Sequence, residues 1–233
     1  MFFREKRRRI RLSQSASLKA ARDRGLPVAC VIDVGVQRAT GSLIEVFPDR
    51  PHLLFEPVAE FVPDIRRNYA GIEHDLFELA LSDMDGEGFL QTSGHGGGGG
   101  VTHAWVSGKG ERVRLARLDS VIPNSGRQGP FLLKIDVDGA DAPAKIIDGA
   151  AGIMSDVACV VSEMVADRFT DLATRIERSG FTLWDIVESA YYDDVFYQCD
   201  AIFIRKDVIA KNEGLRPFSI RSFDPGKWRA IIA

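Results

Sequence analysis

The sequence of 233 residues predicts an α/β fold, with a mostly parallel, doubly wound sheet that ends in a C-terminal antiparallel hairpin. Continuous apolar runs at 28–32 and 157–161, and a run at 131–135 that is apolar except at Lys134, are typical of strands buried on both faces, as strands of parallel sheets are. Stretches with helical apolar spacing alternate with such runs, which favours βαβ units. Residues 181–187 and 199–204 predict two further strands with no helix between them, hence the closing hairpin.

The remaining elements follow from the spacing of apolar residues. A helix is expected over residues 14–24 and is stopped by Gly25 and Pro27. The others are a helix at 41–47, a strand at 52–55, a helix at 58–69, a third strand at 76–81, a short edge strand at 86–90, a strand at 113–118 and helices at 141–148 and 168–179. The glycine-rich stretch 92–100 is either a mobile lid over a pocket or a plain linker.

Length and patterning suggest one α/β domain over residues 28–206. Residues 1–27 are expected to form a basic leader and a helix, and residues 207–233 an irregular tail that packs on the domain or extends from it. The leader carries six Lys or Arg residues between Arg4 and Arg11. We favour a solvated leader over one that contacts nucleic acid or an anionic membrane.

Composition excludes several classes of protein. Hydrophobic residues make up 45% and charged residues 27%, as in an ordinary globular protein, and the net charge of −3 argues against a nucleic-acid partner. No apolar run is long enough for a membrane span. The three cysteines (Cys30, Cys159 and Cys199) form neither a disulfide framework nor a metal pair. Buried free thiols, and therefore a cytoplasmic location, are expected.

Acidic residues directly follow five of the predicted strands. They are Asp33, Glu56, Asp83, Asp136 and Glu163. Each could merely cap a helix. Ligands of open α/β sheets, however, bind outside the carboxyl ends of the strands, so five acids at one edge favour a cationic ligand.

The first turn helps to choose that ligand. A dinucleotide site needs a second glycine two residues after Gly35, and Gln37 stands there, which weakens the nicotinamide hypothesis. S-adenosylmethionine has an amino-acid head, a ribose and an adenine but no phosphate, and it suits this turn better. Asp33 would orient the loop or meet the ammonium, and Gly35 would let the backbone pass close to the ligand. Glu56, 23 positions after Asp33, would take the ribose hydroxyls, and Ser82 with Asp83 would meet the adenine edge.

The chain resembles the FkbM family of S-adenosylmethionine-dependent methyltransferases over roughly residues 28–165. The segments that carry the resemblance are 31–35 with Phe47 and Pro48, 55–57 with Asn68, 80–83 with Gly86, 117–119, and above all 133–139. The family usually has Asn at the position of Gln37, Gly at that of Ala39, and Glu at those of Asp138 and Asp141. The resemblance implies a Rossmann-like class I methyltransferase fold with seven strands, and O-methylation, often of sugar hydroxyls in glycans or natural products.

These arguments define a predicted site. The cofactor residues are Asp33, Gly35, Gln37, Glu56, Pro57, Ser82, Asp83 and Asp136. The catalytic candidates are Asp136, then Glu163, with His103 as a base unless it is simply a surface histidine. Asp136, Asp138 and Glu163 could hold Mg²⁺, the alternative being that Asp138 caps the next helix.

The expected partner is a small-molecule or glycan acceptor. Tyr191 to Asp194 and Trp184 could stack on a sugar ring, although aromatic residues at strand ends more often pack. The apolar edges of the terminal strands leave room for a homodimer. A non-catalytic binding module on the same fold stays open because of Gln37 and Ala39. A nucleic-acid methyltransferase is disfavoured, since residues 136–139 lack an Asn-Pro-Pro-Tyr-type segment.

Overall fold

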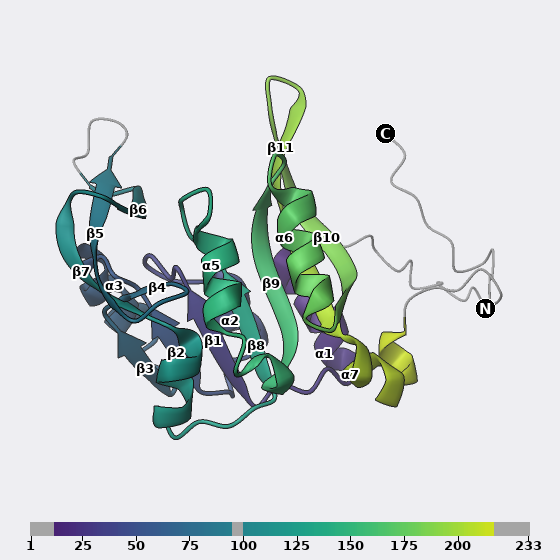
Figure 1. The fold of residues 1–233 in the computed structure, drawn as a ribbon. Coiled ribbons are helices and arrows are strands. Elements are labelled where there is room, and N and C mark those ends of the chain that lie inside the picture. Colours follow the sequence, from purple (N-terminus) through teal and green to yellow (C-terminus); the bar gives the residue numbers. More distant parts are fainter. Residues whose placement is uncertain (1–11, 95–99, 217–233) are drawn as a thin grey trace, which may run out of the picture.

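The computed structural model describes residues 12–94 and 100–216, and its centre is a seven-stranded sheet in the order β10-β11-β9-β8-β1-β2-β3 (Figure 1). The five strands from β9 to β3 are parallel, whereas β11 is antiparallel to both of its neighbours. The bounds are β1 (Cys30–Val34), β2 (His52–Phe55), β3 (His74–Phe77), β8 (Phe131–Ile135), β9 (Val157–Val165), β10 (Phe181–Tyr192) and β11 (Val195–Arg205). This order confirms the Rossmann-like, mostly parallel sheet with a C-terminal antiparallel hairpin.

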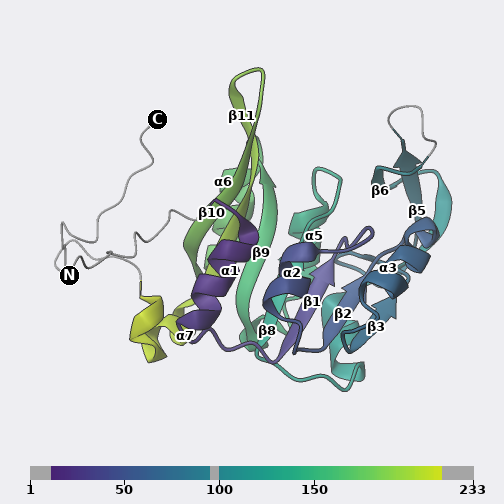
Figure 2. The ribbon, with the colours of Figure 1, turned by 180° about the vertical axis from the view of Figure 1, so that it is seen from behind.

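Helices cover both faces of this sheet (Figures 1 and 2). One face packs against α4 (Leu118–Val121), α5 (Ala142–Gly149) and α6 (Phe169–Arg178). The other packs against α1 (Gln14–Asp23), α2 (Gly41–Val46), α3 (Val62–Asn68) and α7 (Lys206–Lys211). Short 3₁₀ turns complete the chain at Ala59–Phe61, Ile122–Asn124, Met154–Asp156 and Glu213–Leu215.

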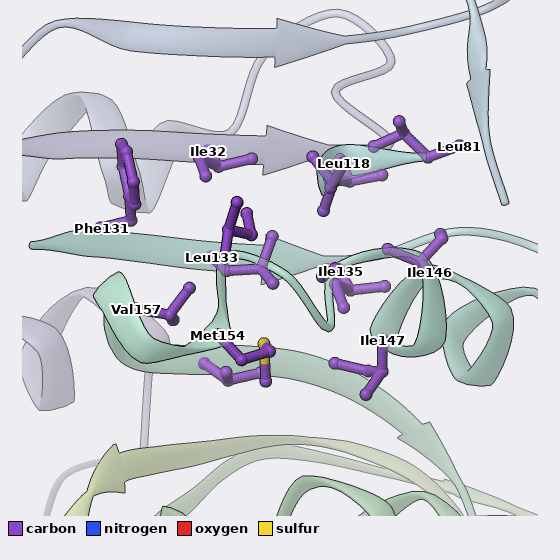
Figure 3. Packing of buried hydrophobic residues seen from close by; sticks show 14 of the residues in the cluster. Ile32, Leu81, Leu118, Phe131, Leu133, Ile135, Ile146, Ile147, Met154 and Val157 are labelled. Atoms are coloured by element: carbon purple, nitrogen blue, oxygen red, sulfur yellow. The ribbon is translucent and has the colours of Figure 1, made fainter. Parts of the chain in front are cut away.

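Alternate residues of the central strands supply the two cores. Ile32 and Leu133 face Ile146 and Ile147 of α5, as Figure 3 shows from close by. Val31, one position from Ile32, joins the other core with α1 and α2. Because side chains alternate across a strand, a strand between two helical layers is apolar at most positions on both faces. This explains the continuous runs in the sequence.

A second sheet of four strands, in the order β4-β7-β5-β6, stands beside the β3 edge (Figure 1). Its strands are β4 (Ala80–Leu81), β5 (Gly86–Ser93), β6 (His103–Ser107) and β7 (Glu111–Ala116). The single third strand expected at 76–81 is therefore wrong: it is divided between two sheets. The backbone N–H of Leu79 donates to the carbonyl of Phe77 at 3.0 Å in a tight turn, after which β4 pairs with β7. The strand β6 was not predicted.

Several boundaries also differ from those expected. β1 begins and ends later than predicted, so Asp33 lies within the strand, and β9 extends past Glu163. The tail is not irregular from residue 207, because α7 forms there and buries Ile209, with Leu215 buried just beyond. The basic residues 1–11, glycines 96–99 and residues 217–233 lie outside the described part of the chain. No helix within residues 12–94 and 100–216 is long and apolar enough to cross a membrane.

Candidate functional site

A cleft of about 430 Å³ opens at the carboxyl ends of β1, β2 and β8. Its volume lies in the range of small-molecule sites. Among its lining residues are Gln14, Ser15, Gly35, Gln37, Ala39, Ser42, Glu56, Pro57, Phe61, Thr102, Ala104, Lys134, Asp136, Asp138, Glu188 and Asp200. Five of the lining residues are carboxylates and one, Lys134, is a cation. The cleft is therefore suited to a ligand with positive charge.

Gly35 ends β1 at the floor of this cleft. Its φ of 80° lies in the left-handed region, and a Cβ atom there would overlap the carbonyl oxygen of Asp136. Only glycine allows the ends of β1 and β8 to approach this closely. The glycine predicted as a cofactor residue thus also shapes the backbone of the site itself.

Glu56, directly after β2, is buried and lines the cleft. Its Oε2 atom accepts a hydrogen bond from the backbone N–H of Gln37 at 2.8 Å, and its Oε1 atom accepts one from Val58 at 2.9 Å. Burial raises the pKa of this carboxyl to about 7, although both hydrogen bonds oppose the shift. Each carboxylate oxygen has a second lone pair, so Glu56 can still accept from a ligand hydroxyl.

Asp33 is fully buried and is not among the residues that line the cleft. Its Oδ2 atom accepts from the hydroxyl of Tyr69 at 3.1 Å, and its Oδ1 atom lies 3.7 Å from Nζ of Lys134. The Tyr69 hydroxyl in turn accepts from the backbone N–H of Thr40 at 3.2 Å. Asp33 therefore supports the loop after β1 from beneath, which is one of the two roles expected of it, and direct contact with an ammonium is excluded in this arrangement.

Lys134 joins Asp33 to the cleft. Its ammonium is 2.9 Å from Oδ2 of Asp136 and donates a hydrogen bond to it. Burial opposes the charge on Lys134, but the carboxylates of Asp33 and Asp136 outweigh it and raise its pKa. A charged lysine therefore holds the Asp136 side chain at the end of β8.

A second cleft of about 610 Å³ adjoins the first and shares Gln37, Thr102, Asp136 and Asp138 with it. Glu163 of β9 lines only this second cleft, together with His103 of β6. The Oε1 atom of Glu163 accepts from the side-chain amide of Gln198 at 2.5 Å. Burial, followed by the charges of Asp136 and Asp200, raises the pKa of Glu163 to about 7. The two predicted catalytic acids, Asp136 and Glu163, thus both line the second cleft.

His103 and Asp138 lie where the second sheet meets the first. His103 is exposed in β6, not in a loop, and its Nδ1 atom is 3.0 Å from the hydroxyl of Thr102. Asp138 does not cap α5: its Oδ2 atom accepts from the backbone N–H of Ala104 at 2.9 Å. Within residues 12–94 and 100–216, no group of three His, Cys, Asp or Glu side chains could hold a metal. The hypothesis of Mg²⁺ at Asp136, Asp138 and Glu163 is thus unsupported.

The remaining predicted cofactor residues divide into those that line a cleft and those that do not. Pro57 and Gln37 line the first cleft, Gln37 with a φ of 51° and with its amide donating to the Thr102 carbonyl at 3.1 Å. Ser82 and Asp83 line neither cleft, because they follow β4 and not a strand of the main sheet. The carbonyl of Ser82 instead lies against Gly149, at the far end of α5 from the cleft.

Sequence reasoning missed Gln14, Glu188 and Asp200, which close one end of the first cleft. Gln14 is the first residue of α1, Glu188 lies in β10 and Asp200 in β11. Glu188 lies 174 positions and Asp200 lies 186 positions after Gln14 in the sequence. No motif spacing links them, and of the three only Asp200 falls within a strand predicted from the sequence, at 199–204.

The aromatic residues proposed to stack on a sugar lie apart from one another. Trp184 packs with the core on the α1 face, and the guanidinium of Arg24 lies 5.8 Å from its ring. Tyr191 and Tyr192 are exposed at the tip of the β10–β11 hairpin, which projects beyond the sheet (Figure 1). Of the aromatic residues in this hairpin, Tyr197 is the one that lines the second cleft.

No family model and no curated protein matches the sequence. Among solved structures, the chain is similar to N-methyltransferase NodS from Bradyrhizobium japonicum in complex with S-adenosylhomocysteine (7% identity, TM-score 0.49, 82% of this chain and 85% of that one). It is also similar to a TehB-like S-adenosylmethionine-dependent methyltransferase from Corynebacterium glutamicum (13%, 0.45, 83% and 89%) and to fibrillarin from Aeropyrum pernix with natively bound S-adenosylmethionine (13%, 0.45, 80% and 76%). At these TM-scores and identities, the likenesses do not indicate which cofactor or acceptor this chain binds.

Proposed function

We propose that this chain is an S-adenosylmethionine-dependent methyltransferase that methylates a hydroxyl of a sugar or related natural-product acceptor. The observation that carries the proposal is the pair of adjoining clefts that meet at Asp136. One suits a cationic nucleoside, and the other offers Glu163 as a proton acceptor. The resemblance of segment 133–139 to the FkbM family supports the same activity.

The first cleft fits the cofactor in its chemistry. Glu56 has lone pairs for the ribose hydroxyls, as acids at the end of a second strand do in related sheets. Pro57 and Val137 line both the cleft and a small apolar recess beside it, which suits the adenine. The five carboxylates favour the positive charge of the sulfonium and the ammonium. When bound, the cofactor supplies an electrophilic methyl group.

The acceptor in the second cleft must present its oxygen in line with that methyl group. The new O–C bond then forms as the S–C bond breaks, its electron pair stays on sulfur, and the hydroxyl proton needs a base. We assign the base to Glu163 in preference to Asp136, because a base works best with a pKa near the working pH. Glu163 has a pKa of about 7, whereas an oxygen of Asp136 already accepts a hydrogen bond from the ammonium of Lys134. His103 is the other candidate for the base that accepts this proton.

Three further features bear on the wider setting. A sugar acceptor rests on the family resemblance and on the polar rim of the second cleft, where Tyr197 offers one aromatic face. The thiols of Cys30, Cys159 and Cys199 are unpaired and buried, which supports a reducing compartment such as the cytoplasm. The exposed apolar residues Leu183 and Ile186 on β10 support the proposal of a homodimer.

The runner-up is a binding module without catalysis. It is favoured by the loop after β1, where the backbone N–H of Gln37 already donates to Glu56 and where Ala39 places a methyl group in the cleft. A binding module would take up adenosylhomocysteine and adenosylmethionine without ever transferring a methyl group to any hydroxyl compound in an acceptor panel.

Calorimetry with S-adenosylhomocysteine tests the cofactor site. We expect the wild type to bind, and Glu56→Ala to weaken binding by about tenfold or more, because it removes hydrogen bonds from two hydroxyls to a charged group. Glu78→Ala is the matched control, since Glu78 follows the neighbouring strand β3 but lies outside both clefts. Absence of binding by the wild type would refute the proposal, and equal binding by the two variants would refute the site.

A further inference from the structure

The two ends of the first cleft are formed by different segments of the chain. Glu56, Pro57 and Phe61 close one end, and they follow β2. The other end is built where α1, α2, β10 and β11 meet, and it presents Gln14, Ser42, Glu188 and Asp200. On the proposed function, on which this inference rests, the ribose lies at Glu56. The amino-acid part of the cofactor then extends toward the second end.

Gln14 connects the elements of that end. Its side-chain amide donates to Oδ2 of Asp200 at 2.7 Å, and its amide oxygen accepts from the hydroxyl of Ser42. Its backbone N–H donates to Oε1 of Glu188 at 2.8 Å. Although it is polar and stands at the start of a helix, Gln14 is only 4% exposed. A buried amide with every partner in place holds those partners in one geometry.

One carboxylate oxygen of Asp200 is available to accept a hydrogen bond from a ligand. Its Oδ2 atom accepts the hydrogen bond from Gln14, and its Oδ1 atom takes part in no hydrogen bond identified among the described residues. Burial, and then the charge of Asp136, raise the pKa of Asp200 to about 6, so the group is ionised at neutral pH. A carboxylate in this setting gains from a cation placed beside it.

The end of the cleft that contains Asp200 also presents a positive charge. Lys134 lines the cleft, and the charge of Asp200 is among those that raise its pKa, so the two groups are close enough to interact. A ligand head that carries both an ammonium and a carboxylate matches this pair. The acid expected to meet the ammonium, Asp33, lies buried beneath the floor.

We propose that Asp200 binds the α-ammonium of the cofactor and that Gln14 is the positioning residue that holds its carboxylate. The helix α1, which precedes the α/β core in the sequence, is thereby part of cofactor recognition. The ammonium of the amino-acid head is thus recognised by residues from the two ends of the described chain, Gln14 and Asp200.

The test compares two ligands by calorimetry: S-adenosylhomocysteine, which has the amino-acid head, and methylthioadenosine, which lacks it. The variants are Asp200→Asn, which keeps the shape and removes the charge, and Gln14→Met, which removes the amide. Gln91→Met is the matched control, because Gln91 lies in β5 of the second sheet and lines neither cleft. Circular dichroism and thermal melting confirm that each variant is folded.

We expect Asp200→Asn to weaken adenosylhomocysteine binding by about tenfold or more and to leave methylthioadenosine binding unchanged. Gln14→Met should act in the same direction by a smaller factor, and Gln91→Met should change neither affinity. Equal losses for both ligands would mean a purely structural role and would overturn the inference. So would a wild type that binds both ligands equally well, although the proposed function would survive. A wild type that binds neither ligand would refute both.

Discussion

Replacing Glu163 by Gln should make the protein more stable at high pH. Burial, and after it the charges of Asp136 and Asp200, raise the pKa of this carboxyl from 4.5 to about 7. The folded state therefore holds the proton more tightly than the unfolded state between these values, and stability falls as the pH rises through that window. At about 1.36 kcal/mol for each pKa unit, the full cost above pH 7 is about 3 kcal/mol.

Solvent screens the charge of this partly exposed carboxyl and neighbouring acids share the cost, so we expect Glu163→Gln to raise the free energy of unfolding by only roughly 1–2 kcal/mol at pH 8. At pH 4 the carboxyl is protonated when folded and mostly protonated when unfolded, and glutamine resembles the neutral acid. The gain should then be close to zero. A group that lowers stability in this way is typical of a functional site.

Urea denaturation at the two pH values measures the effect, and it requires no acceptor. Glu177→Gln is the matched control, because Glu177 is exposed on α6 and should change stability by less than about 0.5 kcal/mol at either pH. A gain of the same size at pH 4 and pH 8, or no gain at pH 8, would refute the argument that burial raises the pKa of Glu163.

The backbone and the buried charges give two further predictions. Gly35→Ala should lower the free energy of unfolding by about 2–4 kcal/mol, because the new methyl group meets the Asp136 carbonyl at a positive φ, whereas Gly71→Ala, with open space around it, should be near neutral in the same urea titration. Lys134→Met should cost about 3–5 kcal/mol, because it leaves the charge of Asp33 buried and uncompensated. Adding Asp33→Asn should recover part of that loss, and a double variant no more stable than the single one would contradict the ion-pair argument.

Local signals predicted the main sheet well. A strand buried between two helical layers needs apolar residues at nearly every position, so 131–135, with Lys134 as its one polar residue, and 157–161 stand out without any knowledge of their partners. Glu56 and Asp136 were placed for the same reason, since each directly follows such a run. Gly35 was also found, although its closest neighbour, the carbonyl of Asp136, lies a hundred residues away.

The errors of the sequence-based prediction concern segments whose structure depends on which strand they pair with. The stretch 76–81 is apolar except at Glu78, and nothing within it reveals that the chain turns after Phe77 and that residues 80–81 pair with a strand at 115–116. Ser82 and Asp83 were misplaced in consequence. The strand β6 is short and half exposed, so it lacks both apolar continuity and clear alternation.

The sequence by itself determined the parallel sheet, the acids at its carboxyl edge and a family resemblance, because each of these is written in short continuous segments. Only the tertiary structure decided which acids line the two clefts. Burial took Asp33 out of the cleft and raised the pKa of Glu163. The buried side-chain amide of Gln14, at the start of α1, donates a hydrogen bond to Asp200, which lies 186 positions later in the sequence. Such contacts depend on how distant elements pack, and no local pattern encodes them.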